Sequence, residues 1–395
     1  MKVVRDPIHG NIELDELTLS LIDTPSMQRL RRVRQLGLSN LVYPGANHTR
    51  FEHSIGVMHL TSMISKMDSI SNDEMNELRA AALIHDIGHG PLSHLSEGII
   101  ELYTKRKHDD IKYILKKDEI SDILNKYGLN PTTISNHIKG NTALGQILNS
   151  EIDVDRMDYL IRDAHYTGVA YSIVDHVRLI QKLKLYGDKL IVASGGLNAA
   201  ESLLVSRFLM HPSVYYHHVS RIAETMCKKA IIYLIEKKTI NPSELKSMDD
   251  GMLFSIMHQD DGYAKEIVQR LDERKLYKRA LYAGFDTVDK TVLEFRDNIE
   301  RIEKEIADMV GIEPEAVLID IPKKPEIAEL KALIEINGKM VSLDEASSLV
   351  ATLELAHESN WKMGVYTKKI YREDVKKAAF TFFEVKKTTK QVHFR

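Results

Sequence analysis

The sequence predicts a mainly α-helical protein with a small α+β unit in its C-terminal part. Apolar residues recur at helical spacing through most of the first 310 residues. After about residue 311, short strand-like runs alternate with turn residues and helical runs. We therefore expect a large helical domain over residues 1–310 and a small α+β domain over residues 311–395.

Several stretches of the first part carry the helical pattern. Thr24 precedes Pro25, which is the favoured order of a helix N-cap and the first helical position. The run ELRAAALIHDI over residues 77–87 predicts a buried helix. Residues 151–165 and 198–236 have similar spacing. These segments together predict a helical core.

The C-terminal part alternates between strand and helix patterns. AVLIDIP and ALIEI predict strands, and Asn337-Gly338 predicts a hairpin turn. The following runs predict a capped helix over SLDEASSLVATLELA, a strand over WKMGVYTKKI and a helix over REDVKKAAFTFF. This part has no obvious catalytic cluster, so we expect the functional site in the first part.

The composition argues against several classes of protein. The net charge of −3 disfavours a large polyanion-binding surface. Cys227 is the only cysteine, which rules out an intramolecular disulfide or a thiolate zinc site and fits a reducing compartment. The sequence begins without an apolar export segment and has no apolar run of membrane-spanning length. We therefore expect a cytoplasmic protein that does not enter membranes.

The dipeptide His85-Asp86 is the most specific local signal. It ends the predicted buried helix and is followed by IGHG. An imidazole and a carboxylate form a mixed nitrogen and oxygen donor set, which suits Mn, Fe, Zn, Ni or Mg better than a thiophilic metal. Most such pairs, taken alone, are ordinary residues of a helix end, so other segments must decide the interpretation.

Two other segments carry further candidate ligands. In RFEHS, His53 begins a helix close to Arg50. In EIDVDRMDYLIRD, the residues Asp155, Tyr159 and Asp163 recur at i, i+4 and i+8, opposite an apolar stripe. A polar stripe of this kind is usually a solvated helix face, but it also suits one wall of a pocket.

The order His53, His85-Asp86, Asp155 resembles the H…HD…D signature of the HD superfamily. The surrounding sequence is similar to the dNTP triphosphohydrolase branch, which includes the human sterile-alpha-motif and HD-domain enzyme and a bacterial and archaeal group. The similar segments are KVVRDPIHGNIEL, IDTPSMQRLRRVRQLG, YPGANHTRFEHSIGV, ALIHDIGHGPLSH and DVDRMDYLIRDAHYTG. The resemblance is dense over residues 2–220 and continues at LDERKLYKRAL.

This resemblance implies an HD-domain helical core with its metal site within about residues 45–220. The implied ligands of the divalent cation are His53, His85, Asp86 and Asp155. Turnover would use Mg or Mn, and Fe, Zn, Ni or Mn are open alternatives for the metal as bound.

The resemblance also implies the residues that act on the substrate. His89, His94 and His108 would surround the transferring phosphorus, and His94 would protonate the leaving 5′-oxygen or otherwise act on the α-phosphate. Asp153 would orient His94. The implied substrate-binding residues are Gln35, Leu36, Arg50, Arg156, Tyr159, Asp163, Arg207, His211 and Tyr215.

Within this set, the resemblance implies distinct positions for phosphate and sugar. Arg50 matches the α-phosphate position and Arg207 the terminal-phosphate position. Gln35 and Asp163 would hold the 3′-hydroxyl, and Tyr159 would pack where a 2′-hydroxyl has to fit. The implied reaction is hydrolysis of a dNTP to a deoxynucleoside and triphosphate.

An effector site for a guanine-nucleotide activator, GTP or dGTP, is implied as well. Its residues would be Lys2, Val3, Asp23, Gln28 and Arg31, joined by Arg274 and Lys278 of a neighbouring subunit. The resemblance therefore implies a homotetramer. The stretch LIVASGGLNAAE lacks the basic residues that the human enzyme places against a second effector, which argues against a paired dNTP effector.

Two other functions remain open. The chain could be an HD phosphohydrolase that acts on other nucleotides, as a phosphomonoesterase or a phosphodiesterase, because the metal ligands alone do not separate these reactions. It could also be a non-catalytic nucleotide sensor on the same fold. A local basic patch at residues 29–34 leaves nucleic-acid binding open.

Overall fold

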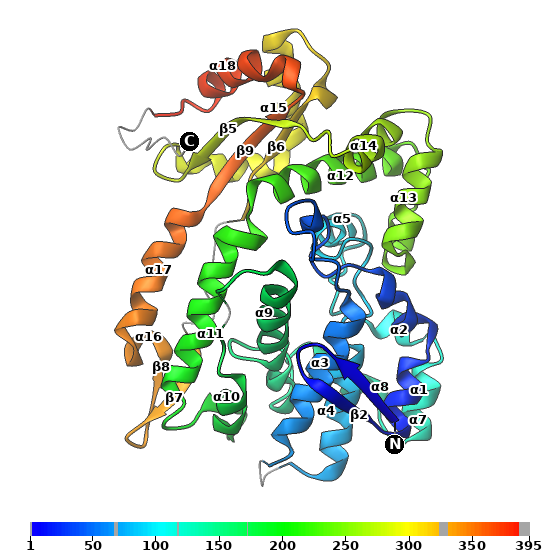
Figure 1. Cartoon of the computed structure of the whole chain (residues 1–395), viewed down its shortest axis with the longest axis vertical. Coiled ribbons are helices and arrows are strands. Elements are labelled where there is room, and N and C mark those ends of the chain that lie inside the picture. Colours follow the sequence, from blue (N-terminus) through cyan, green and yellow to red (C-terminus); the bar gives the residue numbers. More distant parts are fainter. Residues whose placement is uncertain (1, 67–69, 117, 172, 324–330, 387–395) are drawn as a thin grey trace.

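Helices form most of the computed structural model, and three small sheets join them (Figure 1). The structure describes residues 2–66, 70–116, 118–171, 173–323 and 331–386. The mainly α fold predicted from the sequence is thereby confirmed.

The first part of the chain contains most of the helices. They are α1 (Glu16–Ile22), α2 (Pro25–Arg29), α3 (Arg50–Ser62), α4 (Asn72–Ile84), α5 (His94–Thr104), α6 (Lys112–Leu115), α7 (Ile120–Lys126), α8 (Pro131–Ile138), α9 (Val154–Thr167), α10 (His176–Lys182), α11 (Leu197–Met210), α12 (His218–Glu236), α13 (Asp250–Gln259), α14 (Tyr263–Asp272) and α15 (Ile299–Val310). The later helices are α16 (Leu343–Ala346), α17 (Ser348–Asn360) and α18 (Arg372–Phe382).

Helix α3 packs between α4 and α9 in the middle of the helical part (Figure 1). Their apolar sides meet in one core, in which Leu60, Leu78 and Leu160 are fully buried. A capping box between Ser71 and Glu74 begins α4, because each residue's side chain bonds to the backbone N–H of the other. This packing fixes the ends of the three helices relative to one another, and the predicted metal ligands lie at those ends.

The predicted helix over residues 198–236 is interrupted in the structure. Helix α11 ends at Met210, a π-helical turn follows over His211–Tyr215, and α12 begins at His218. Pro212 lies in this turn and has no backbone N–H to continue the α-helical hydrogen bonds. A wide turn of this kind often marks a functional site.

The strands form three sheets. They are β1 (Lys2–Asp6), β2 (Gly10–Leu14), β3 (Leu183–Tyr186), β4 (Lys189–Val192), β5 (Lys278–Gly284), β6 (Val317–Asp320), β7 (Leu333–Ile336), β8 (Lys339–Ser342) and β9 (Lys362–Thr367). Strands β1 and β2 form a hairpin, and the other sheets have the orders β3-β4-β7-β8 and β5-β9-β6. The sequence analysis predicted none of the strands before residue 311.

The predicted Asn337-Gly338 turn joins β7 and β8, and both residues adopt positive φ, 51° and 76°. Two sheets combine strands from before and after residue 311. The proposed division into domains at that position therefore does not follow the sheets. Among the described residues, no helix has the length and apolar composition needed to cross a membrane.

Candidate active site

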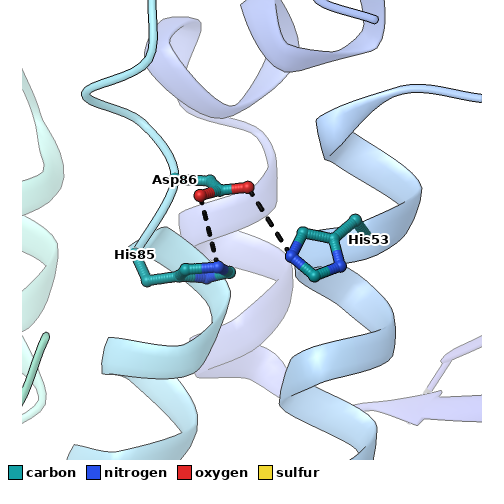
Figure 2. Close-up of side chains that lie close together, drawn as sticks. All are labelled: His53, His85 and Asp86. Atoms are coloured by element: carbon teal, nitrogen blue, oxygen red, sulfur yellow. Dashed lines mark ion pairs between the residues drawn. The ribbon is translucent and has the colours of Figure 1, made fainter. Parts of the chain in front are cut away.

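Three of the predicted metal ligands meet where α3 begins and α4 ends. Figure 2 shows the side chains of His53, His85 and Asp86 pointing toward one another. One ligand atom from each residue lies within 4.8 Å of the others. The distance from Asp86 Oδ2 to His53 Nε2 is 3.7 Å, and the distance from Asp86 Oδ1 to His85 Nε2 is 3.3 Å.

Asp155, at the start of α9, brings the fourth predicted ligand to the same place. Its Oδ1 lies 2.8 Å from His53 Nε2 and 3.6 Å from His85 Nε2. The structure therefore brings together two imidazoles and two carboxylates from three different segments of the chain. This donor set suits a borderline or hard divalent cation.

Hydrogen bonds at Nδ1 orient the imidazole rings of His53 and His85. His53 Nδ1 donates to Asp158 Oδ2 over 2.8 Å, and His85 Nδ1 donates to the Ala82 carbonyl over 2.7 Å. Each Nε2 consequently faces the carboxylates, and the buried Nε2 of His85 has no hydrogen-bond partner among the residues that the structure describes. An unpartnered imidazole nitrogen that faces two carboxylates fits a divalent cation.

The carboxylates at this centre favour the binding of positive charge. Burial opposes a charge on His53, but hydrogen bonds to Asp155 and Asp158 raise its pKa to about 10. Burial also favours the neutral form of Asp155, yet His53 and His85 hold the pKa of that carboxyl well below its ordinary value. A divalent cation would displace the protons and supply the same compensation.

Asp158 is a site residue that the sequence analysis missed. Besides His53, its carboxylate contacts His9 Nε2 at 2.6 Å and accepts from Arg162 Nε at 2.8 Å. The fully buried Arg162 also donates to Asp6 over 2.8 Å. Because Asp6 and His9 lie at the turn between β1 and β2, this network ties the N-terminal hairpin to the metal ligands.

Arg50 lies directly beside the metal centre. Its Nη1 donates to Asp86 Oδ2 over 2.7 Å, and its Nε donates to Ser93 Oγ over 2.7 Å. Its Nη2 lies 3.5 Å from His94 Nε2. The guanidinium is thus held between a predicted metal ligand and a predicted catalytic histidine, which is a suitable place to bind a phosphate.

Glu97, which the sequence analysis also missed, joins two of the predicted catalytic histidines. Its carboxylate contacts His94 Nδ1 at 2.9 Å and also His108 Nδ1. The His108 ring stacks on His89 at 4.3 Å. Gly88 permits this approach, because a Cβ there would lie 1.9 Å from the carbonyl oxygen of His108. The three histidines therefore form one cluster with a shared carboxylate.

The predicted role of Asp153 as the partner of His94 is wrong. Asp153 caps α9 instead, where it accepts from the backbone N–H groups of Arg156 at 2.8 Å and Ser150 at 3.0 Å. It also forms an ion pair with the Arg156 side chain. An acidic N-cap satisfies the free amides of a helix start, and this local requirement occupies the carboxylate. His94 takes its carboxylate partner from Glu97.

A cavity of about 730 Å³ adjoins the metal centre, a size in the range of small-molecule sites. It is lined by His85, Asp86 and Asp155, and by the clustered His89, His94 and His108. Every predicted substrate-binding residue lines it as well: Gln35, Leu36, Arg50, Arg156, Tyr159, Asp163, Arg207, His211 and Tyr215.

One wall of the cavity is rich in hydrogen-bonding groups. The buried carboxylate of Asp163 contacts His48 Nε2 at 2.8 Å and accepts from the Tyr215 hydroxyl over 2.9 Å. The rings of Tyr159 and Tyr215 lie 6.3 Å apart. Gln35 Oε1 is buried and has no hydrogen-bond partner in the described part of the chain. This wall can bind a small polyhydroxylated group.

Two cations lie near Tyr159 on the same side of the cavity. Burial raises the pKa of Tyr159, whereas the charges of Arg207 and Arg156 lower it. Arg156 itself is paired with Asp153. The cavity therefore offers positive charge both here and at Arg50.

The predicted effector residues lie outside the cavity lining. Lys2 and Val3 are exposed on β1, and Asp23 is exposed after α1. Gln28 donates to the carbonyl of Ile22 and accepts from Arg31 Nε over 2.9 Å. These contacts bring the side chains of Gln28 and Arg31 together. The binding of an effector at these residues stays a prediction.

Arg274 and Lys278, which were predicted to join the effector site from a neighbouring subunit, do not lie on one helix. Helix α14 ends at Asp272, and Arg274 adopts a left-handed φ of 53°. Its Nε donates to the carbonyl of Leu41 over 2.9 Å. Lys278 is the first residue of β5, so strand pairing sets the direction of this segment.

Comparisons with known proteins agree with the geometry. The HD domain family matches residues 50–163, and the HD associated region matches residues 174–394. A protein of Methanocaldococcus jannaschii described as uncharacterized is 36% identical in an alignment of 385 residues, and the alignment covers 93% of this chain and 80% of that protein. The deoxynucleoside triphosphate triphosphohydrolase of Homo sapiens is 28% identical in an alignment of 390 residues that covers 82% of this chain and 61% of the human protein.

Two solved structures are similar over almost their full length. A hypothetical protein of Aquifex aeolicus has a TM-score of 0.78 and 29% identity, with 96% of this chain and 99% of that chain covered. A phosphohydrolase of Bacteroides thetaiotaomicron has a TM-score of 0.75 and 25% identity, with 93% and 100% covered. The chain thus belongs to the HD superfamily of phosphohydrolases, in the branch that includes the deoxynucleoside triphosphate triphosphohydrolases.

Proposed function

We propose that this protein is a divalent-metal-dependent triphosphohydrolase that converts a dNTP and water into a deoxynucleoside and triphosphate. The observation that carries the proposal is the lining of one cavity. Predicted metal ligands, clustered histidines, the Asp163 wall and arginines all face the same space of about 730 Å³. Cations at two separate places along this cavity suit a chain of phosphates better than a single phosphomonoester.

Phosphate binding is assigned to the arginines. Arg50 would take the α-phosphate, since its guanidinium is fixed by Asp86 and Ser93. Arg207 and Arg156 would face the outer phosphates. A bound divalent cation would supply Lewis acidity that neutralises charge on the phosphate it contacts.

Proton transfer is assigned to His94. Because Glu97 accepts the Nδ1 hydrogen of His94, the tautomer and direction of the ring are set, and its Nε2 lies beside Arg50. An imidazolium Nε2–H at the α-phosphate can donate to the 5′-oxygen as the bond from that oxygen to the α-phosphorus breaks. Although burial opposes the shift, Glu97 raises the pKa of His108, which would add positive charge to the same region. Burial and the charge of Arg50 lower the pKa of His89, which would act there as a neutral ring.

The sugar would lie against the wall that contains Asp163. Gln35 and Asp163 would bind the 3′-hydroxyl, and the Tyr159 ring would exclude a 2′-hydroxyl. The human relative is a deoxynucleoside triphosphate triphosphohydrolase, which supports the deoxyribose preference. Activation by GTP or dGTP and assembly into a homotetramer belong to the same proposal and rest on the resemblance.

The decisive experiment identifies the first product. The purified protein is incubated with each dNTP and each rNTP in Mg or Mn, with and without GTP. Chromatography then separates triphosphate from orthophosphate and nucleoside from nucleotides. Triphosphate and deoxynucleoside are expected in equal amounts from dNTPs. Orthophosphate with a nucleoside diphosphate as the first products would favour another phosphohydrolase instead.

A second experiment distinguishes an enzyme from a nucleotide sensor. His53→Ala and Asp86→Ala should lose both bound metal and turnover. Retention of metal and of activity in both variants would show that this centre does not carry the reaction.

A further inference from the structure

The cavity continues past the sugar wall to α12 and to the segment that follows β6. Four residues with polar groups line this region, which we call the outer end: Tyr216, Arg221, Glu224 and Lys323. Three of them belong to the turn before α12 or to its first turns, and Lys323 comes from beyond β6. The outer end therefore combines the helical part with the C-terminal sheet, since β6 packs against α12.

Glu224 is unusual among the acidic residues of the cavity. Among the described residues, its carboxylate has no hydrogen bond and no ion pair, whereas Asp163 and Glu97 each have two partners. Burial raises the pKa of Glu224 to about 7, although Arg221 opposes this shift. A carboxylate that lacks partners and faces a cavity is suited to a ligand that brings hydrogen-bond donors.

Arg221 lies one helical turn before Glu224 and is held in a fixed direction. Its Nε and Nη2 both donate to Asp320, which occupies two of its three nitrogens. Its guanidinium lies 4.9 Å from the centre of the Tyr216 ring, and that ring stacks on His211 at 5.3 Å. Arg221 Nη1 therefore remains to donate to a ligand, beside an aromatic surface.

The charges of the outer end determine which part of a nucleotide can bind there. A carboxylate repels phosphate, so the triphosphate belongs with Arg50, Arg156 and Arg207. The uncharged base then extends to the outer end. Guanine presents two adjacent donors, N1–H and the 2-amino group, which match the two oxygens of a carboxylate. Its O6 and N7 are acceptors, which match Arg221 or Lys323.

The other bases fit this arrangement less well. Adenine and cytosine each place an acceptor nitrogen beside the amino group, so they match only a protonated Glu224, whereas the two donors of guanine stabilise the ionised carboxylate. Thymine has one N–H between two carbonyl groups. We propose that Glu224 and Arg221 read the nucleobase of the substrate and make guanine the preferred base; this inference rests on the proposed dNTP hydrolysis.

The first test uses the unmodified protein with the natural dNTPs and one base analogue. The kcat/KM for release of triphosphate is measured for the four dNTPs and for deoxyinosine triphosphate, which differs from dGTP only by lacking the 2-amino group. We expect dGTP to exceed the other natural dNTPs and to exceed deoxyinosine triphosphate by about 10-fold, as for the loss of one partner of a bidentate pair. Equal values for dGTP and deoxyinosine triphosphate would overturn the inference.

The second test changes the protein. Glu224→Gln replaces one acceptor by a donor, so the side chain then matches the acceptor-and-amino edge of adenine or cytosine. The ratio of kcat/KM for dGTP to that for dATP should fall by about 10- to 100-fold. The matched control is Glu236→Gln, a change at an exposed residue on the same helix, which should leave this ratio unchanged.

The outcomes separate the two proposals. If the unmodified protein releases triphosphate from no dNTP, the proposed function fails. If it releases triphosphate but the ratio of dGTP to dATP is the same in Glu224→Gln, only the inference about the base fails. The measurement with deoxyinosine triphosphate decides the matter even if the variant does not fold.

Discussion

The metal centre and the outer end of the same cavity are built in opposite ways. At the metal centre, His53, His85 and Arg50 are each held by a second contact that fixes their direction. At the outer end, Asp320 holds Arg221, but Glu224 and Lys323 have no hydrogen bond or ion pair within the part of the chain that the structure describes. The difference teaches that the groups needed for chemistry are all positioned before the substrate binds, whereas the outer end keeps a carboxylate and an ammonium group for the substrate.

The largest effect is expected from removing a ligand of the metal centre. His53→Ala and Asp86→Ala should each reduce turnover by roughly 10³-fold or more, because a cation no longer neutralises the phosphate. Metal content measured by elemental analysis should fall in parallel. Glu236→Ala, at an exposed position on α12, serves as the control and should retain both. Normal turnover in His53→Ala and Asp86→Ala would contradict the assignment of the chemistry to the metal centre.

The next effect is expected from the residue behind His53. Asp158→Asn leaves the buried Arg162 with less compensation, which should lower the free energy of unfolding by about 3–5 kcal/mol. It also replaces the charged carboxylate that orients His53 by a neutral amide, which is a weaker acceptor, so metal affinity should fall about 10- to 100-fold. Urea denaturation and metal titration against a chelator measure the two effects. Stability and affinity equal to those of the exposed control Asp122→Asn would contradict this assignment.

A smaller effect is expected at Glu97. Glu97→Gln should lower kcat by about 100-fold while metal content stays unchanged, because His94 loses its carboxylate partner. Burial lowers the pKa of His108, but Glu97 raises it above its ordinary value. Without that carboxylate the pKa of His108 falls, so its protonated form is lost at lower pH. A pH–rate profile identical in shape to that of the unmodified protein would argue against the role of Glu97.

The smallest effect is expected at Asp250, which binds the backbone of the loop that contains Ser93. Asp250 accepts from the backbone N–H groups of Leu92 at 2.7 Å and Arg34 at 3.1 Å. Burial nevertheless raises its pKa to about 6. The folded protein therefore favours neutral Asp250, and stability from this residue is lost as pH rises from its unfolded toward its folded pKa.

The loss should amount to about 1 kcal/mol between about pH 5 and about pH 7. Denaturation of the unmodified protein and of Asp250→Asn at several pH values isolates this contribution, since other titrating groups are common to both. The difference in unfolding free energy between the two proteins should change in favour of the variant as pH rises. A constant difference would show that Asp250 is ionised without penalty.

The metal ligands were predictable because each lies in a short motif that resembles a motif of the HD superfamily. His85 and Asp86 are adjacent, and Asp155 stands at the start of a strongly patterned helix. Glu97 also had a local signal, since it follows His94 by three residues on α5 and so shares its face. Asp153 was predicted as the partner of His94 instead, but its carboxylate caps α9.

Other features depend on contacts between distant segments and left no local pattern. The importance of Asp158 rests on His9, which is 149 residues away. Strand β5 was not predicted because KRALYAG lacks clear alternation, and its conformation depends on pairing with β9. Glu224 resembles any polar residue of an amphipathic helix until the cavity around it is known.

The parallel pairing of β4 with β7 has a consequence for how this protein is made. Ile191 and Val192 find their strand partners only at Leu333 and Ile334. During synthesis, the β3-β4 hairpin must therefore wait with an open edge until much of the remaining chain has left the ribosome. Late, non-local pairing of this kind is slow and leaves edges that can join other chains. The nascent chain should thus be most vulnerable to aggregation just before the β7-β8 hairpin emerges.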